Sequence, residues 1–169
     1  DLHVRSRRQR PMCIRDSPLA VSPLAIDEQS RKEFKKIIKK ENIGSEISVI
    51  VENNLKTSGL FNPLNKDAFL QAPEIANLKP RFEDWSLIKA QALITGKVTF
   101  INEKLRVEFR LWDVLAAKEI MALAFTTVPN NWRRVGHIIS DKVYERLTGE
   151  KGYFDTRIIY VAEELSLIH

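Results

Sequence analysis

The chain has 169 residues, which suffices for one domain of ordinary size, and its formal net charge is +5. No apolar run is long enough to cross a membrane, and no signal peptide is recognisable. The sequence contains one cysteine, Cys13, so an intramolecular disulfide and a multi-thiolate metal site are excluded.

Both ends of the chain correspond to translated sequencing adapter. Residues 12–17, Met-Cys-Ile-Arg-Asp-Ser, match the translation of the adapter end ATGTGTATAAGAGACAG, and residues 165–169, Leu-Ser-Leu-Ile-His, match the translation of its reverse complement, CTGTCTCTTATACAC. We therefore expect residues 1–17 and 165–169 to be adapter-derived tails, and leave them out of the reasoning about fold. The alternative for the first tail is a natural basic arm that binds nucleic acid, but such an arm would not encode both strands of one oligonucleotide.

Removing the first tail changes the charge of the chain. Residues 1–17 contain five arginines and two aspartates, so the net charge falls from +5 to +2, and Cys13 is removed as well. The remaining core is close to neutral and has no strong field for nucleic acid or anionic lipid. Without cysteine, the core is compatible with either the periplasm or the cytosol.

In the first part of the core, the sequence patterns indicate a short strand and then a charged segment. Residues 19–21 lie between Pro18 and Pro23 and indicate a short strand. Residues 27–41 form a Lys-rich insert in which a brief helix could carry one apolar stripe. A basic contact patch is one interpretation of this insert. We favour a solvated insert, because acidic residues balance its lysines.

A stronger helix pattern follows from Asn42, which is a typical N-cap residue, to Gly59, which suits a left-handed position after a helix end. We expect this helix to pack by one face. A linking segment through Pro73 and Pro80 comes next, and a short helix is expected within residues 81–91. The apolar stripe of the first helix is Ile43, Ile47, Ile50, Val51 and Leu55.

The middle of the chain predicts strands. Residues 92–101 are rich in β-forming residues, residues 102–104 indicate a turn, and residues 105–112 alternate between apolar and polar side chains, as in a half-buried antiparallel strand. Together they predict a hairpin. Residues 119–128 are apolar on both faces, so we expect a strand that lies centrally under helices.

The last helix is expected after Pro129 and should stop at Gly149. Its apolar stripe covers the sheet in this interpretation. The predicted fold class is α+β, a two-layer domain with helices packed on one face of a mixed, mostly antiparallel sheet. The stripe consists of Trp132, Val135, Ile139, Val143 and Leu147.

Several segments, taken in order, carry a resemblance to a known family. They include Asn-Leu-Lys-Thr-Ser-Gly-Leu-Phe-Asn-Pro-Leu at 54–64, Phe-Arg-Leu-Trp-Asp-Val at 109–114 and Tyr-Glu-Arg-Leu-Thr-Gly at 144–149. With these segments the chain resembles an alphaproteobacterial-like member of the TolB family of the Tol-Pal envelope system. The other matching segments are residues 18–24, 92–98 and 156–161.

The resemblance implies a domain organisation. Residues 18–149 would form the amino-terminal α+β domain of the family, and residues 150–164 would be a linker and the first strand of a truncated β-propeller. A lone propeller strand exposes unpaired backbone groups, so we expect residues 150–164 to be poorly fixed.

The resemblance also implies a function. Members of the family are periplasmic scaffold proteins that support outer-membrane integrity and constriction during cell division, and colicins exploit them for import. The partners would be TolA, through an amino-terminal extension, and the lipoprotein Pal, through the propeller. Both contact regions are expected to be missing here, so no binding residues are assigned, and neither a cofactor nor membrane insertion is expected.

Catalysis is not expected. His137 is the only core histidine, and Asp141 lies one helical turn further on, so an oriented base can be imagined. However, the core has no thiol, no second histidine for a metal site and no phosphate-binding loop. We therefore interpret His137 as a helix-flank residue with a weak contact to Asp141, and we predict no catalytic, cofactor-binding or metal-binding residue.

The alternative from another class is a small α+β module that binds nucleic acid. It would use Arg106, Arg110 and Trp112, which share the polar face of one predicted strand. Glu108 lies among them, and the near-neutral core argues against this interpretation.

Overall fold

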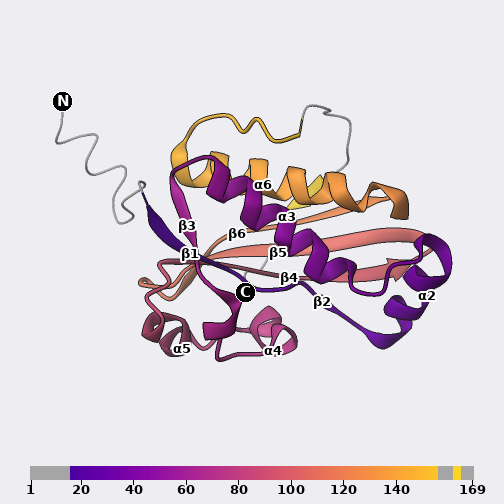
Figure 1. Cartoon of the computed structure of the whole chain (residues 1–169), viewed down its shortest axis with the longest axis horizontal. Helices are drawn as coiled ribbons and strands as arrows, with labels where there is room; N and C mark the ends of the chain where they lie inside the picture. The colour runs from indigo at the N-terminus through magenta and orange to yellow at the C-terminus, as the bar shows by residue number, and fades with distance from the viewer. Residues whose placement is uncertain (1–15, 156–161, 165–169) are drawn as a thin grey trace.

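The computed structural model describes residues 16–155 and 162–164, and their centre is one seven-stranded sheet (Figure 1). Six strands follow the order β3-β1-β4-β5-β6-β7, and β2 pairs with β4 beside this path. The strands are β1 (Ser17–Val21), β2 (Ala25–Ile26), β3 (Phe61–Pro63), β4 (Ala92–Ile101), β5 (Lys104–Asp113), β6 (Lys118–Thr127) and β7 (Ala162–Glu164).

The sheet is mixed, as predicted. The three pairs β1–β3, β1–β4 and β2–β4 are parallel, whereas the pairs β4–β5, β5–β6 and β6–β7 are antiparallel. The predicted hairpin is confirmed: Asn102 and Glu103 connect β4 to β5 with φ angles of 52° and 62°, the left-handed geometry that suits two-residue hairpin turns. The predicted alternation of β5 is also confirmed, because Leu105, Val107 and Phe109 are fully buried.

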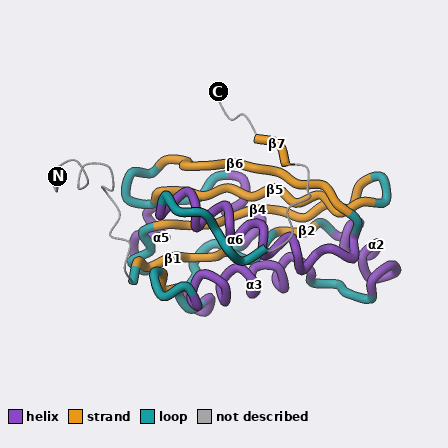
Figure 2. The backbone as a smooth tube through the Cα atoms, turned by 90° about the horizontal axis from the view of Figure 1, so that it is seen from above, coloured by secondary structure: helices purple, strands orange, loops and turns teal. Residues whose placement is uncertain are grey.

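The prediction that residues 119–128 form a central strand is wrong. The central strands are β4 and β5, while β6 has only the three-residue β7 on its outer side, opposite residues 123–125 (Figure 2). Met121 and Leu123 are accordingly only partly buried. These residues are apolar because they pack under the helices from one side. Residue type alone does not distinguish this packing from that of a strand buried on both faces.

Two long helices, α3 (Ile43–Thr57) and α6 (Trp132–Thr148), cover one face of the sheet. They cross closely: a Cβ added to Gly136 of α6 would lie 2.7 Å from Ile50 Cγ2 of α3. Both predicted helix ends are confirmed, since Gly59 and Gly149 have φ angles of 82° and 81°. Asn42 precedes α3 as predicted but does not cap it, because its side chain accepts a hydrogen bond from Arg31.

Two short helices, α4 (Pro73–Leu78) and α5 (Phe82–Leu87), cover one end of the opposite face. Sequence analysis assigned the first of them to a linking segment. They bury the side chains of Ala20, Leu93 and Trp112, which alternate with the residues facing α3 and α6. The predicted α+β class with a two-layer core of helices on a mixed sheet is confirmed, and α4 and α5 add local cover on the second face.

The Lys-rich insert forms a helix with one buried side, which confirms the predicted brief helix with an apolar stripe, and most of its lysines are exposed as expected. Residues 28–38 form α2 (Glu28–Ile38), in which Phe34 is fully buried and packs edge-on against Phe100 at a ring distance of 5.3 Å. Asp27 caps this helix by accepting a hydrogen bond from Ser30 N at 2.7 Å. The lysines are balanced by carboxylates as expected, for example Lys36 by Glu33 at 3.6 Å.

The ends of the chain lie partly outside the described residues. Residues 1–15, 156–161 and 165–169 are not described, so the adapter-derived tails and the propeller strand stay predictions. Residues 162–164 form β7 and pair with β6, so the expectation of unpaired backbone is wrong for them. Ser17 is a buried residue of β1 and its N–H donates to Leu60 O at 3.2 Å. The described sheet therefore begins one residue before the predicted boundary at residue 18.

Candidate protein-docking surface

No group of three or more His, Cys, Asp or Glu side chains in residues 16–155 and 162–164 could hold a metal ion. Within the same described ranges, no helix has the length and apolar character that crossing a membrane requires.

His137 is not oriented by Asp141, so the predicted contact between them is wrong. The His137 ring lies 2.9 Å from Asn54 Nδ2 of the neighbouring helix α3, and Asn54 also donates to Ser140 at 3.0 Å. The Asp141 carboxylate instead accepts hydrogen bonds from the backbone of residues 154 and 155. His137 therefore helps to join α3 to α6.

The residues of the alternative nucleic-acid surface are engaged within the domain. Trp112 is buried beneath α5, where its Nε1 donates to Thr95 Oγ1 at 2.9 Å, so its ring has no exposed face for stacking. Arg110 Nε lies 3.6 Å from Glu119 Oε1. Burial raises the pKa of Glu119, and the charge of Arg110 acts in the opposite direction. The geometry of this face does not favour a single-strand binding site.

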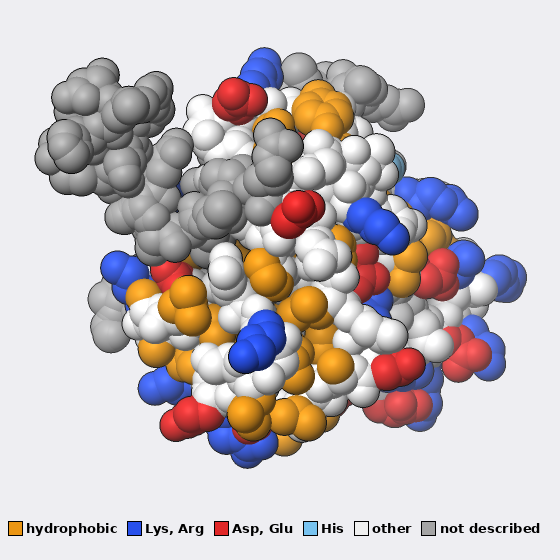
Figure 3. All heavy atoms as spheres, turned by 60° about the vertical axis from the view of Figure 1, so that its left-hand side comes forward, with side chains coloured by type: hydrophobic (Ala, Val, Ile, Leu, Met, Phe, Trp, Pro, Cys, Tyr) orange, Lys and Arg blue, Asp and Glu red, His pale blue; other side chains and the backbone are white. Residues whose placement is uncertain are grey.

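A different surface stands out by its exposed leucines. We call it the α4–α5 surface. Leu78 at the end of α4 is 80% exposed, Leu87 at the end of α5 is 71% exposed, and Leu115 in the turn between β5 and β6 is 65% exposed. Figure 3 shows hydrophobic side chains gathered over the lower part of the molecule, at the height of α4 and α5.

The elements of this surface are held in place from below. Trp85 of α5 is fully buried, packs against Phe69 and donates from Nε1 to Gln71 Oε1 at 2.8 Å. The same amide oxygen accepts a hydrogen bond from Arg81 N at 3.0 Å. The Gln71 side chain thus connects the segment before α4 to the start of α5. Burying Trp85 leaves Leu87, two residues further on, on the outer side of α5.

Charged residues border the α4–α5 surface. An open groove of about 890 Å³ runs beside α5 and is lined by apolar side chains together with Lys79, Arg81, Glu83 and Lys89. Arg81 is paired with Asp84 at 2.8 Å. Exposed apolar side chains beside charged ones are found at protein–protein contacts. Sequence analysis missed it because α4 is too short to show helical periodicity.

Comparisons with known proteins agree with the resemblance noted from the sequence. The family model of the TolB amino-terminal domain matches residues 13–120. The Tol-Pal system protein TolB of Pelagibacter ubique (strain HTCC1062) is 80% identical over 147 residues, which are 87% of this chain and 33% of that protein. The chain thus spans about a third of the length of this curated relative.

Solved structures show the same fold. The crystal structure of TolB from Acinetobacter baumannii has a TM-score of 0.61 at 21% identity, over 83% of this chain and 30% of that chain. The hypothetical protein CT253 from Chlamydia trachomatis has a TM-score of 0.54 at 12% identity, over 80% of this chain and 99% of that chain. In the second protein the fold makes up nearly the whole chain, so it can stand as one domain. Because the family model matches more than half of its residues, the chain belongs to the TolB amino-terminal domain family.

Proposed function

We propose that the chain is the amino-terminal module of a TolB protein and serves the Tol-Pal system as a scaffold and interaction component. The observation that carries this proposal is the family match over residues 13–120 together with the relative that is 80% identical. The exposed leucines of the α4–α5 surface suit a further protein contact of such a component, separate from the two partners named below. The proposal assigns the chain no catalytic step.

The proposed setting is the periplasm, where the complete protein would support outer-membrane integrity and constriction during division. Its partners would be TolA, bound by a segment that precedes residue 18, and Pal, bound by a propeller whose first strand lies within residues 150–164 and whose other strands follow. In this proposal, residues 18–149 form the domain that carries both parts. The module by itself would then bind neither partner tightly.

A complementation experiment tests the proposed function. The host is a Gram-negative strain whose own TolB gene is deleted, and the readouts are survival on deoxycholate and leakage of periplasmic protein. We expect a longer gene product, with the preceding and following segments, to restore survival and retention, and this chain alone to restore neither. The host's own TolB and an empty vector are the controls. Failure of the longer product at the expression level of the host protein, or rescue by this chain alone, contradicts the proposal.

A further inference from the structure

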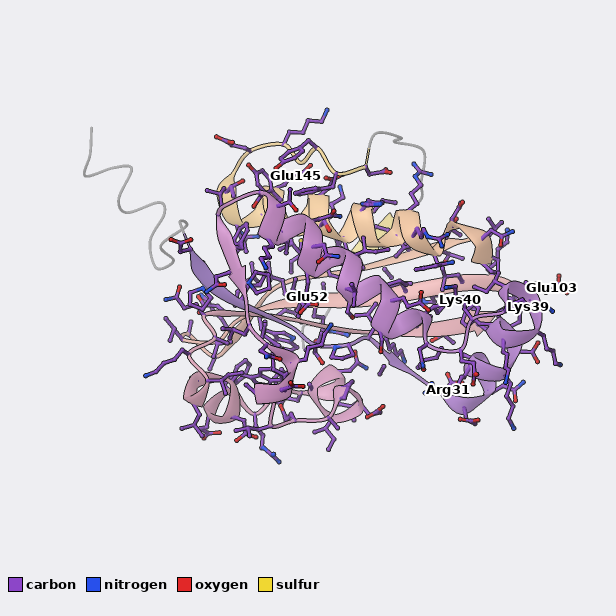
Figure 4. All side chains as sticks on the ribbon, viewed as in Figure 1. Arg31, Lys39, Lys40, Glu52, Glu103 and Glu145 are labelled. Carbon is purple, nitrogen blue, oxygen red and sulfur yellow. The ribbon has the colours of Figure 1, made fainter. Side chains whose placement is uncertain are left out.

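The segment that follows α6 is attached to that helix along its outer side. Residues 150–155, which we call the exit strap, cross back over the helix layer after Gly149 (Figure 2). In Figure 4, Glu145 lies on α6 below this segment. The expectation that the chain is poorly fixed after residue 149 is therefore wrong for the exit strap.

Two carboxylates of α6 hold the backbone of the exit strap. Asp141 accepts from Phe154 N with Oδ1 at 2.6 Å and from Asp155 N with Oδ2 at 3.0 Å. One turn further along the helix, Glu145 Oε2 accepts from Gly152 N at 3.0 Å. Three N–H groups in four residues are thus satisfied by carboxylates, and hydrogen bonds to charged acceptors are the stronger kind.

Side chains of the exit strap make further contacts with α6. Asp155 pairs with Arg134, with 3.2 Å between Asp155 Oδ1 and Arg134 Nε, and the aspartate side chain is only 8% exposed. Tyr144 of α6 packs edge-on against the rings of both Tyr153 and Phe154, at 5.6 and 5.8 Å. Ion pair, rings and backbone contacts span residues 134 to 145, nearly the whole length of α6.

The fit at Gly152 shows how closely the two parts approach. A Cβ added to Gly152 would lie 2.6 Å from Asp141 Oδ1 and 2.7 Å from Asp141 Cα. Such distances require movement of the backbone, because real Cβ atoms do not approach so closely. The glycine therefore permits the carboxylate of Asp141 to reach the N–H groups that follow.

The carboxylates in this contact repel one another, so their charges need nearby donors or cations. Burial raises the pKa of Asp141, the backbone N–H donors of Phe154 and Asp155 act against that rise, and the charges of Asp155 and Glu145 add to it. Arg134 is the cation paired with Asp155. The donors and this arginine offset the cost of holding three carboxylates together.

We propose that the exit strap is an integral part of the domain that fixes the direction in which the chain leaves α6, with Asp141 as the positioning residue. The strap replaces a free linker, so whatever follows in a longer protein starts from one defined place beside Arg134. This inference does not depend on the identity of the partners.

Amide hydrogen exchange in the complete ¹⁵N-labelled chain tests the proposal residue by residue. In the native chain, the amides of Gly152, Phe154 and Asp155 should be protected. Asp141→Asn preserves the shape of the side chain but turns one acceptor into a donor, so exchange at Phe154 and Asp155 should become at least about tenfold faster. Gly152→Ala should accelerate exchange at all three positions, because the methyl group displaces the strap.

The control is Asp67→Asn, which removes the charge of an exposed aspartate outside the contact and should leave the three amides unchanged. Amides of Ile94 and Val107 in the central strands report whether a variant still folds. The proposal is wrong if the three strap amides exchange at unprotected rates in the native chain, or if the amides of Phe154 and Asp155 stay protected in Asp141→Asn. If a variant unfolds, two measurements on the native chain decide the question. They are the amide exchange rates and the ¹⁵N heteronuclear NOE values of residues 152–155, and both are expected to equal those of α6.

Discussion

Replacing Trp85 with alanine is expected to destabilise the domain by about 3 to 5 kcal/mol. Trp85 is the largest fully buried side chain between the sheet and the helices α4 and α5. The substitution removes its contact with Phe69 and the hydrogen bond to Gln71 Oε1. Urea unfolding followed by far-UV circular dichroism measures the change, with an unaltered m-value as the sign that the unfolding reaction is the same.

Two further variants separate packing from hydrogen bonding at this position. Trp85→Phe keeps a buried ring and loses the indole donor, so an intermediate loss of about 1 to 3 kcal/mol is expected. Leu87→Ala, on the exposed side of the same helix, should change stability by no more than about 0.5 kcal/mol. A loss for Trp85→Ala as small as that for Leu87→Ala would show that α4 and α5 do not enclose a core on the second face.

Replacing Phe34 with alanine is expected to cost about 3 to 5 kcal/mol as well, because its ring is fully buried in the main core. The residue also packs against Phe100 at the end of β4. If α2 did not pack against the sheet, the same substitution would have almost no effect. Urea unfolding of the two proteins under one set of conditions distinguishes these outcomes.

Ile37→Ala is the matched control for Phe34→Ala. Ile37 lies in the same helix and is 49% exposed, so its truncation should cost less than about 1 kcal/mol. Equal losses for the two variants would mean that the side of α2 facing the sheet is assigned incorrectly.

Elements with a regular local pattern could be predicted from the sequence. The helices α3 and α6 carry apolar residues at helical spacing and end at glycines that adopt positive φ angles. The strand β5 alternates between apolar and polar residues, and its hairpin with β4 follows from two adjacent strands with a short turn. In these elements the local period and the turn chemistry agree with the fold.

Features that depend on distant partners could not be predicted. Trp112 has the position of a half-buried strand residue, and only the presence of α5 above it makes it a core residue. The place of β6 near the sheet edge is a property of strand order, which its own residues do not encode.

The α4–α5 surface and the exit strap could not be predicted from the sequence for the same reason. Exposed leucines such as Leu78 look like core residues in sequence. Asp141 accepts hydrogen bonds from Phe154 N and Asp155 N, which lie 13 and 14 positions further along the chain, and no sequence pattern predicts such contacts. The contact with His137 that the helical spacing suggests does not form.

Direct binding to Pal and TolA tests the central claim that this chain is the module of a TolB-type scaffold. Isothermal titration calorimetry is carried out with the soluble domain of each partner, once against this chain and once against the longer protein that includes the preceding and following segments. The account predicts binding of both partners by the longer protein and no measurable heat with this chain. Binding of Pal by this chain as tightly as by the longer protein, or no binding by the longer protein, would contradict it.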